Sequence, residues 1–259
     1  MQIVIPMTGD GKRFRAAGYD RLKPMIRVHD VPMVEWVTRL FPGSSHQITF
    51  ICRREHLEQL GYLEPELKRI APAGRILEIH DWIKRGPVND LLRVQDEIED
   101  DEPVIVSYCD YFMLWDYSHF LRAVANGKFD GAVPCYSGFH PHLLPPENLY
   151  ASCRVDADDL LLEVREKFSW TEDRTLSRHS PGLYYFRSGR LMKTYCAKLI
   201  ESGQSIAGEY YVSTVFNGMA EDGLKVWCPN NVSHFCQWGT PRDLAEYHGW
   251  VSPILARKR

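Results

Sequence analysis

The chain has 259 residues, of which 44% are hydrophobic and 25% charged, and its formal net charge is −3 at pH 7. This length allows a sizeable core, and the slightly acidic balance gives no support for a nucleic-acid-binding surface. No stretch approaches the roughly 18 uninterrupted apolar residues of a membrane span. The apolar run at the N-terminus is typical of a strand and lacks the pattern of a signal peptide. We therefore expect a cytoplasmic protein with neither nucleic-acid nor membrane partners.

The seven cysteines form no C-x-x-C pair, and most of them lie in apolar runs. We expect reduced thiols in the core, in preference to disulfides or zinc ligands.

The first half of the chain alternates predicted strands and helices, which favours a largely parallel sheet covered on both faces. Strands are predicted at 2–5, 47–52, 75–79, 103–106 and 130–135. We expect a helix of about ten residues from Pro32, and one or two helices over 54–71 with a break near Gly61 or Pro65. Further helices are predicted at 88–98 and at 117–125, the latter capped by Asp116.

The regular alternation of predicted strands and helices ends after residue 136. A hairpin is predicted from 150–155 and 160–164, followed by a strand at 182–186 and helices at 188–202 and 209–220. Short strands at 224–228 and 234–236 precede a closing helix at 241–249, which Thr240 caps with Asp243 three residues on. No linker separates two units, so we expect one domain over residues 1–259.

A loop with two glycines follows the first predicted strand. Gly9 and Gly11 allow the backbone to approach a ligand and to point successive N–H groups at it, as a phosphate requires. Lys12, Arg13 and Lys23 add three cations within a short span. A glycine turn with solvated charges is the simpler alternative.

The pattern G-x-G-x-R-F, followed ten residues on by K-P-M, resembles the signature of the nucleotidyltransferases (pyrophosphorylases) that make NDP-sugars. The resemblance runs from Gln2 to about Tyr247. It implies an α/β, Rossmann-like three-layer fold with a mixed, mainly parallel central sheet. Residues 1–135 would form the nucleotide-binding half, and 136–259 the acceptor-binding half with the closing helix. The implied reaction is Mg²⁺-dependent transfer of NMP from an NTP to a phosphorylated acceptor, with release of pyrophosphate.

The resemblance also assigns roles to the loop. Arg13 and Lys23 would be catalytic cations on the triphosphate. The other implied nucleotide-binding residues are Met7, Thr8, Gly9, Asp10, Gly11, Lys12, Gly86, Pro87 and Asn89. Asp10 is unusual there, because a carboxylate near phosphates could contact metal or ribose or simply point to solvent. The turn at Gly86 would otherwise only begin a helix, with Pro87 at its first position.

Asp110 is the expected metal ligand. It follows a buried predicted strand, and open α/β folds bind ligands at the carboxyl ends of their strands. Such an aspartate is ordinarily a turn or cap residue; the resemblance assigns it a catalytic role as the Mg²⁺ anchor, and magnesium needs few protein carboxylates. Many family members carry a second aspartate where this chain has Gln237. The metal would then depend on Asp110, phosphates and water, or on another carboxylate such as Asp10.

The acceptor half contains three further matches to the family. In Val164-Arg165-Glu166-Lys167, which resembles V-x-E-K, Glu166 would contact the acceptor and Lys167 would act as the catalytic cation on its phosphate. An exposed Glu–Lys pair is ordinarily only solvated. Gly182 begins a segment resembling the G-x-Y-x-F strand. Glu209 precedes a helix that faces the acceptor, unless it merely caps that helix. Gly239-Thr240-Pro241 resembles the closing G-T-P-x-D-L motif.

Several alternatives stay open at this level. His140 and His142 would need further ligands to form a zinc site. Asp173, Arg174 and Arg178 could recognise a charged acceptor or form a solvated loop. We expect a sugar 1-phosphate acceptor in the synthesis of capsule or surface-polysaccharide precursors. A non-sugar acceptor (a phosphoamino acid or a phosphocholine-like compound, with CTP) and a non-catalytic regulator that binds a nucleotide or a sugar nucleotide are the rivals. The base and the oligomeric state, including a homo-oligomer, are left open.

Overall fold

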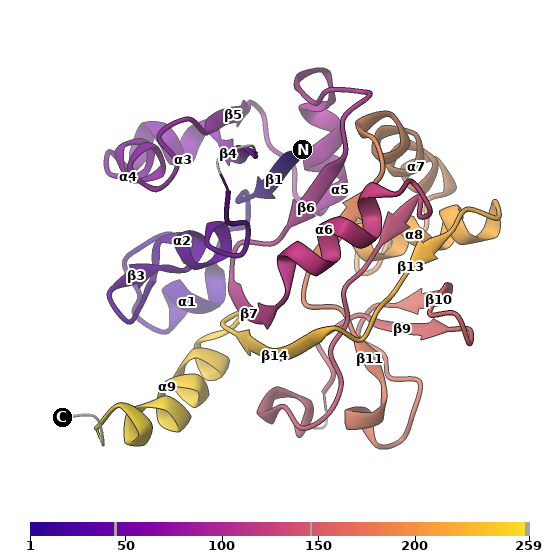
Figure 1. Cartoon of the computed structure of the whole chain (residues 1–259). Coiled ribbons are helices and arrows are strands. Elements are labelled where there is room, and N and C mark those ends of the chain that lie inside the picture. Colours follow the sequence, from indigo (N-terminus) through magenta and orange to yellow (C-terminus); the bar gives the residue numbers. More distant parts are fainter. Residues whose placement is uncertain (44–45, 146, 257–259) are drawn as a thin grey trace.

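A central seven-stranded sheet organises the structure, a computed structural model that describes residues 1–43, 46–145 and 147–256, with side chains as far as 251. Its strand order is β13-β8-β12-β6-β1-β4-β5 (Figure 1). The strands are β1 (Gln2–Pro6), β4 (Gln47–Arg53), β5 (Arg75–Ile79), β6 (Val104–Ser107), β8 (Gly131–Ala132), β12 (Leu183–Phe186) and β13 (Val226–Trp227).

The sheet is mixed and mainly parallel. β1 runs parallel to both β4 and β6, β4 to β5, and β8 to β13. β12 lies antiparallel between β6 and β8. All five residues of β1 are buried, as expected for a strand covered on both faces. Since β12 and β13 join strands from the first half, both halves of the chain build one sheet.

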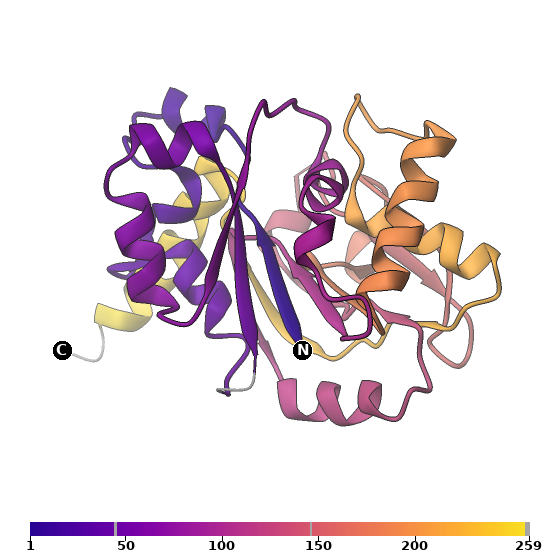
Figure 2. The same ribbon diagram turned by 90° about the horizontal axis from the view of Figure 1, so that it is seen from above.

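Helices cover both faces of this sheet, as Figure 2 shows from above. On one face of the sheet, strand side chains such as Val4 pack with α5 (Pro87–Arg93), α7 (Gly189–Ser202) and α8 (Val212–Glu221). On the opposite face, strand side chains such as Ile3 and Ile5 pack with α2 (Met33–Thr38), α4 (Leu63–Ile70) and α6 (Tyr117–Ala125). Successive strand residues point to opposite faces, which is why one apolar run fills two cores. The predicted three-layer Rossmann-like α/β fold is therefore confirmed.

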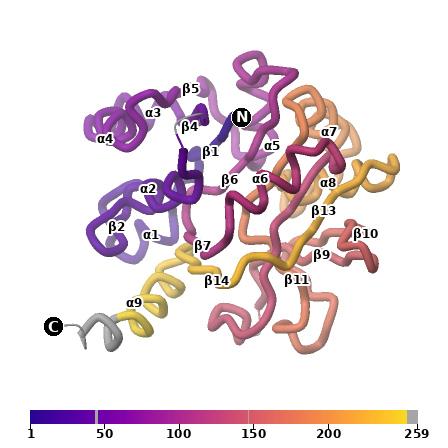
Figure 3. Tube along the Cα trace, in the orientation of Figure 1, coloured from indigo at the N-terminus to yellow at the C-terminus, as the bar shows by residue number. Residues whose placement is uncertain are grey.

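Three small sheets surround the large one. β7 (Tyr111–Trp115) pairs antiparallel with β14 (Val232–Gln237), and this pairing sets Gln237 opposite Tyr111. β9 (Ser152–Val155) pairs with β10 (Leu161–Arg165) as the predicted hairpin, and β11 (Arg178–His179) joins β9. β2 (Arg27–Val28) pairs with β3 (Val31–Pro32). Figure 3 shows α9 (Pro241–Ala256) leaving the body of the molecule after β14.

Several predicted elements have different bounds in the structure. The helix expected from Pro32 is the shorter α2, and the one expected at 88–98 ends at Arg93, before a 3₁₀ turn at Gln95–Glu97. The helix expected from residue 209 begins only at Val212, because Tyr210 is held in backbone hydrogen bonds with the loop before α5. The break in 54–71 falls at 60–62, between α3 (Arg54–Gln59) and α4, and Pro65 lies inside α4. The strand expected at 130–135 shrinks to β8, and β2, β3 and β7 were not predicted.

Both predicted caps are present. The Asp116 carboxylate accepts from the His119 amide at 2.8 Å, and the Thr240 hydroxyl accepts from the Asp243 amide at 3.2 Å. The seven cysteines are free thiols, five of them buried. Within the described part of the chain, no helix is long and apolar enough to cross a membrane.

Candidate active site

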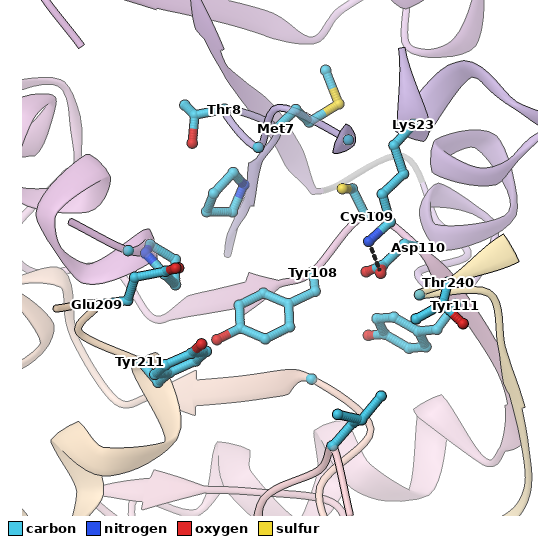
Figure 4. A pocket seen from close by; sticks show the side chains of 18 of the residues that line it. Met7, Thr8, Lys23, Tyr108, Cys109, Asp110, Tyr111, Glu209, Tyr211 and Thr240 are labelled. Carbon is cyan, nitrogen blue, oxygen red and sulfur yellow. Dashed lines mark ion pairs between the residues drawn. The ribbon is translucent and has the colours of Figure 1, made fainter. Parts of the chain in front are cut away.

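A cleft of about 720 Å³ lies at the carboxyl ends of β1 and β6 and draws residues from both halves of the chain. It brings together almost all of the residues that the sequence singled out. Met7, Thr8, Gly9, Asp10, Gly11, Lys12, Arg13, Lys23, Gly86, Pro87, Asp110, Glu166, Lys167, Gly182 and Glu209 all line it. In Figure 4, Tyr108 lies between Glu209 and Tyr211 on one side and Lys23, Asp110 and Thr240 on the other.

The glycine loop lies against the segment that carries Lys23. Gly11 has φ +59°, in the left-handed region that favours glycine, and a β-carbon there would stand 3.3 Å from the Lys23 Cβ. A β-carbon on Gly9 would meet nothing within 4 Å, so the space above the loop is open. The loop can therefore accept a ligand above Gly9 while Gly11 allows Lys23 to pack closely.

Lys23 and Asp110 form an ion pair inside the cleft. The Nζ of Lys23 lies 2.6 Å from Oδ2 of Asp110, and each side chain is only 21% exposed (Figure 4). The same ammonium lies 5.9 Å from the centre of the Phe14 ring. Lys23 and Asp110, two of the four predicted catalytic residues, thus neutralise each other.

Gln237 and Asp243 lie close to Asp110. A β-carbon on Gly239 would stand 3.3 Å from Asp110 Oδ2, 3.5 Å from Gln237 Nε2 and 3.9 Å from Asp243 Oδ2. The Asp243 carboxylate is engaged by the Thr240 hydroxyl at 2.5 Å. Oε1 of Gln237 is buried without a hydrogen-bond partner among the described residues.

These residues fit a divalent cation that takes most of its ligands from phosphate and water. Asp110 supplies a carboxylate, and the Gln237 amide group near it adds no charge. Among the described residues, no group of three or more His, Cys, Asp or Glu side chains is arranged to hold a metal. A site with few protein carboxylates is the usual way of holding Mg²⁺ beside phosphates.

Asp10 is engaged by an arginine that the sequence did not single out. Its carboxylate lies 2.6 Å from Nη2 of Arg53 and 3.6 Å from Nζ of Lys12. Burial alone would raise the pKa of Asp10, but the hydrogen bond and charge of Arg53, with the charges of Lys12 and Arg15, hold that pKa below its ordinary value. Asp10 therefore anchors the loop to the end of β4.

The same arginine belongs to a buried polar network beside the loop. Its guanidinium carbon lies 3.2 Å from the centre of the Trp82 ring, and its Nε donates to the Thr8 carbonyl. Trp82 Nε1 donates to Asp90 at 3.0 Å, and the Thr8 hydroxyl donates to the other oxygen of Asp90. Asp90 is 2% exposed, and burial raises its pKa to about 6 despite these donors. Sequence reasoning missed Arg53, Trp82 and Asp90, which share no local motif.

The turn before α5 enters the cleft, although not with every predicted residue. Gly86 and Pro87 line the cleft together with Asp90, but Asn89 does not. Because successive helical residues are turned by about 100°, positions 87 and 90 share a face and position 89 points elsewhere.

Glu209 does not cap α8. The N-cap position of α8 is Tyr211, and the Glu209 carboxylate lies 2.6 Å from Nζ of Lys84, across the cleft wall. The capping alternative is therefore wrong, since the chain turns back at Glu209 through a bridge to Ile206 before the helix begins.

Glu166 and Lys167 follow β10 at the acceptor side of the cleft. Glu166 accepts a hydrogen bond from the Ser213 hydroxyl, and burial raises its pKa to about 7. Lys167 extends an exposed side chain from a backbone with φ +54°. A left-handed conformation is uncommon for a non-glycine residue and marks local strain, which often accompanies function.

Three tyrosines that the sequence did not single out complete this side. Tyr108, Tyr150 and Tyr211 line the cleft. The hydroxyl of Tyr150 is buried and has no hydrogen-bond partner among the described residues. Gly182, with φ +98°, lets Tyr108 pack closely, because a β-carbon there would stand 2.8 Å from its ring. A donor without a partner in a cleft suits a ligand with several oxygen atoms.

The remaining candidates lie away from the cleft. His142 is hydrogen-bonded to the Tyr136 hydroxyl at 2.8 Å, and His140 accepts a hydrogen bond from the Phe235 amide at 3.2 Å. Both histidines are therefore part of the protein interior. Asp173 accepts from the Thr175 amide at 3.0 Å, and Arg178 pairs with Asp159 at 2.7 Å. Arg174 donates to the Pro145 carbonyl. None of these five lines the cleft.

Solved structures with the same fold include three nucleotidyltransferases. A nucleoside-diphosphate-sugar pyrophosphorylase from Vibrio cholerae RC9 is 19% identical, with a TM-score of 0.74 over 95% of this chain and 98% of that one. A putative glucose-1-phosphate thymidylyltransferase from Bacillus anthracis is 15% identical, with a TM-score of 0.71 over 96% and 94%. An inositol-1-phosphate CTP transferase from T. maritima is 13% identical, with a TM-score of 0.70 over 95% and 96%. At these identities the likeness establishes the fold.

Comparison of the sequence with curated proteins found no match. The sequence profile of the MobA-like NTP transferase domain matches residues 3–174, which is more than half of the chain and includes the glycine loop, Asp110 and Lys167. The chain therefore belongs to the family of MobA-like NTP transferases.

Proposed function

We propose that the protein transfers a nucleoside monophosphate from an NTP to a sugar 1-phosphate and releases pyrophosphate. The observation that carries the proposal is the cleft itself, in which the glycine loop and the Lys23–Asp110 pair share one space with Lys167. Arg13 and Lys167 form no ion pair with a described residue, so both cations are available to a ligand. The reaction needs cations at two places in the cleft, because it joins two substrates that each carry phosphate.

In the proposed reaction an oxygen of the acceptor phosphate attacks the α-phosphorus of the NTP. A new P–O bond forms there while the bond to the bridging oxygen of the β-phosphate breaks, and pyrophosphate leaves with that electron pair. Arg13 and Lys23 hold the triphosphate, and Lys167 holds the acceptor phosphate in line. A magnesium ion anchored by Asp110 would neutralise charge on the phosphates. Positioning and electrostatics carry the rate, since the protein forms no covalent bond.

A sugar 1-phosphate suits the acceptor side of the cleft. Glu166 and the hydroxyl of Tyr150 offer hydrogen bonds of the kind that sugar hydroxyl groups accept and donate. Two of the three solved structures above are named for sugar nucleotides or sugar phosphates. We further propose a cytoplasmic role in the synthesis of capsule or surface-polysaccharide precursors, on the strength of the sequence resemblance.

A non-sugar phosphate acceptor is the second candidate. One protein of this fold is named for inositol 1-phosphate, and Gln237 stands where many relatives carry an aspartate. The acceptor side could therefore serve a different phosphorylated compound with the same phosphate-binding lysine.

Pyrophosphate release separates these candidates. The purified protein is incubated with Mg²⁺, each of four NTPs, and a panel containing hexose 1-phosphates, inositol 1-phosphate, phosphocholine and phosphoserine. We expect turnover with one NTP and a hexose 1-phosphate, and phosphorus NMR then identifies the diphosphate-linked product. Turnover only with a non-sugar phosphate would support the second candidate. Tight NTP binding without turnover for any pair would indicate a nucleotide-binding regulator.

A further inference from the structure

We propose that Lys23 guards Asp110 against divalent cations, so that metal joins the cleft only together with a nucleoside triphosphate. Without a triphosphate, the ammonium group of Lys23 serves as the counter-ion of Asp110. When a triphosphate binds, Lys23 transfers to its phosphate oxygens, and the carboxylate becomes free for the metal. The inference rests on the proposed function and adds an order of binding to it.

The contact between Lys23 and Asp110 makes a metal ion on the same oxygen less favourable. The ammonium nitrogen lies 2.6 Å from Oδ2, and Mg²⁺ would need to approach that oxygen to about 2.1 Å. Two cations so close to one oxygen repel each other, so the ammonium weakens the attraction of Asp110 for a metal ion. Oδ2 is also the oxygen that faces Gly239, and the amide nitrogen of Gln237 lies close to the same glycine. The ammonium therefore contacts the Asp110 oxygen that faces Gly239.

The protein offers too few ligands to attract a metal without phosphate. Gln237 brings a neutral amide to the neighbourhood of Asp110, and Asp243 is engaged by Thr240. No third acidic or imidazole ligand completes a site among the described residues. A lone carboxylate that is already neutralised by a lysine binds hydrated Mg²⁺ weakly, because the ion gives up its water reluctantly.

The position of Lys23 allows the exchange. Its Cβ lies against Gly11, since a β-carbon on that glycine would stand 3.3 Å away. A triphosphate held by the glycine loop would thus lie within reach of the flexible lysine stem, whose three donors suit phosphate oxygens. The exchange leaves both anions neutralised, with Lys23 on the triphosphate and the metal between Asp110 and the phosphates.

Electron paramagnetic resonance of Mn²⁺ tests the order of binding, because the signal of the free ion falls when it binds. We expect the wild-type protein to bind Mn²⁺ at least about tenfold more weakly alone than with a non-hydrolysable α,β-methylene NTP, after correction for Mn²⁺ bound to nucleotide in solution. Lys23→Met removes the ammonium and keeps the stem. It should strengthen Mn²⁺ binding to the protein alone by about tenfold or more.

Two variants control this result. Lys12→Met removes a cation of the same loop that contacts Asp10 and leaves Asp110 untouched, and it should change Mn²⁺ binding by less than about twofold. Adding Asp110→Asn to Lys23→Met should abolish the gained Mn²⁺ binding. Circular dichroism checks that each variant is folded, and Lys23→Gln replaces Lys23→Met if the latter is not.

Equal Mn²⁺ affinity of the wild-type protein with and without the nucleotide would overturn the inference. An unchanged Mn²⁺ affinity in a folded Lys23→Met or Lys23→Gln variant would also overturn it. Failure of the proposed function gives a different result. If calorimetry detects no NTP binding at all, the proposed reaction fails, while the measurements on the nucleotide-free variants still decide whether Lys23 guards Asp110.

Discussion

The backbone of Gly86 packs directly on the backbone of Tyr210. A β-carbon on residue 86 would stand 2.6 Å from both the nitrogen and the oxygen of Tyr210. Two hydrogen bonds join the same segments, from the Tyr210 amide to the Arg85 carbonyl at 2.8 Å and from the Val88 amide to the Tyr210 carbonyl at 3.2 Å. The turn expected to meet the nucleotide and the segment expected to meet the acceptor therefore form one wall of the cleft.

Gly86→Ala should disrupt this wall. Residue 86 has φ +88°, and the added methyl group would collide with backbone that cannot yield, so we expect a loss of about 3 kcal/mol in the free energy of unfolding. Gly18→Ala is the matched control, because φ is +86° there and nothing lies within 4 Å. It should cost only about 1 kcal/mol. Guanidinium unfolding measures both, and equal losses would show that the Tyr210 contact is unimportant.

Asp90 should make stability depend on pH. Burial raises its pKa from 3.8 to about 6 in the folded protein, so the native state holds the proton more tightly than the unfolded state. The resulting stabilisation is complete below pH 4 and is lost as pH rises through 6, with a total of about 3 kcal/mol. In Asp90→Asn the amide side chain does not titrate in this pH range, so the variant lacks this contribution to the pH dependence.

The free energy of unfolding, measured for both proteins from pH 4 to pH 8, should therefore fall for the wild type relative to the Asn variant. A constant difference between the two curves over this range would contradict the effect of burial on Asp90.

Glu166 should give the acceptor KM a pH dependence. Its pKa is raised to about 7 by burial, and the ionised carboxylate accepts hydrogen bonds from acceptor hydroxyls better than the neutral acid does. We expect the acceptor KM to fall about tenfold from pH 6 to pH 8. Glu166→Gln should abolish this change. Glu163→Gln, on β10 and paired with Arg154 and Arg165, should retain the wild-type profile.

Lys167→Gly should separate stability from acceptor binding. Glycine relieves the backbone strain at φ +54°, which should add about 1 kcal/mol to the free energy of unfolding. Loss of the ammonium should raise the acceptor KM by about tenfold or more and leave the NTP KM unchanged. Ala207→Gly relieves similar strain at φ +52° outside the cleft and should change stability alone. A variant at 167 that affects only the NTP KM would refute the role given to Lys167.

Asp110→Asn should lower Mg²⁺-dependent kcat by about 100-fold or more, since it removes the carboxylate that anchors the metal. Asp116→Asn is the control. Asp116 caps α6 and lies outside the cleft, so its replacement should cost at most about 1 kcal/mol of stability without a comparable loss of kcat. Pyrophosphate release at varied Mg²⁺ measures both, and undiminished turnover of Asp110→Asn would mean that the metal is held elsewhere.

The sequence by itself determined the features that depend on neighbouring residues. The apolar run that becomes β1, the Asp116 cap and the Thr240–Asp243 cap involve residues at most a few positions apart, so composition and spacing reveal them. The order of motifs also predicted which segments meet, because the carboxyl ends of β1 and β6 must lie at one edge of a parallel sheet. Gly9, Lys23, Asp110 and Lys167 accordingly line a single cleft.

Only the tertiary structure decided how these residues are paired. Arg53 contacts both Asp10 and Trp82, and Lys84 pairs with Glu209. These partners lie far apart in the sequence, so no repeating pattern of residues predicts the contacts. The pairing of β7 with β14 brings Gln237 beside Asp110. The sequence of either strand alone does not predict which strand it pairs with. The physical reason is that these contacts are selected by burial and charge in the folded state, where an unpaired polar group is costly. Residue type and spacing predicted a phosphate-binding cleft, and packing decided which charges within it are already neutralised.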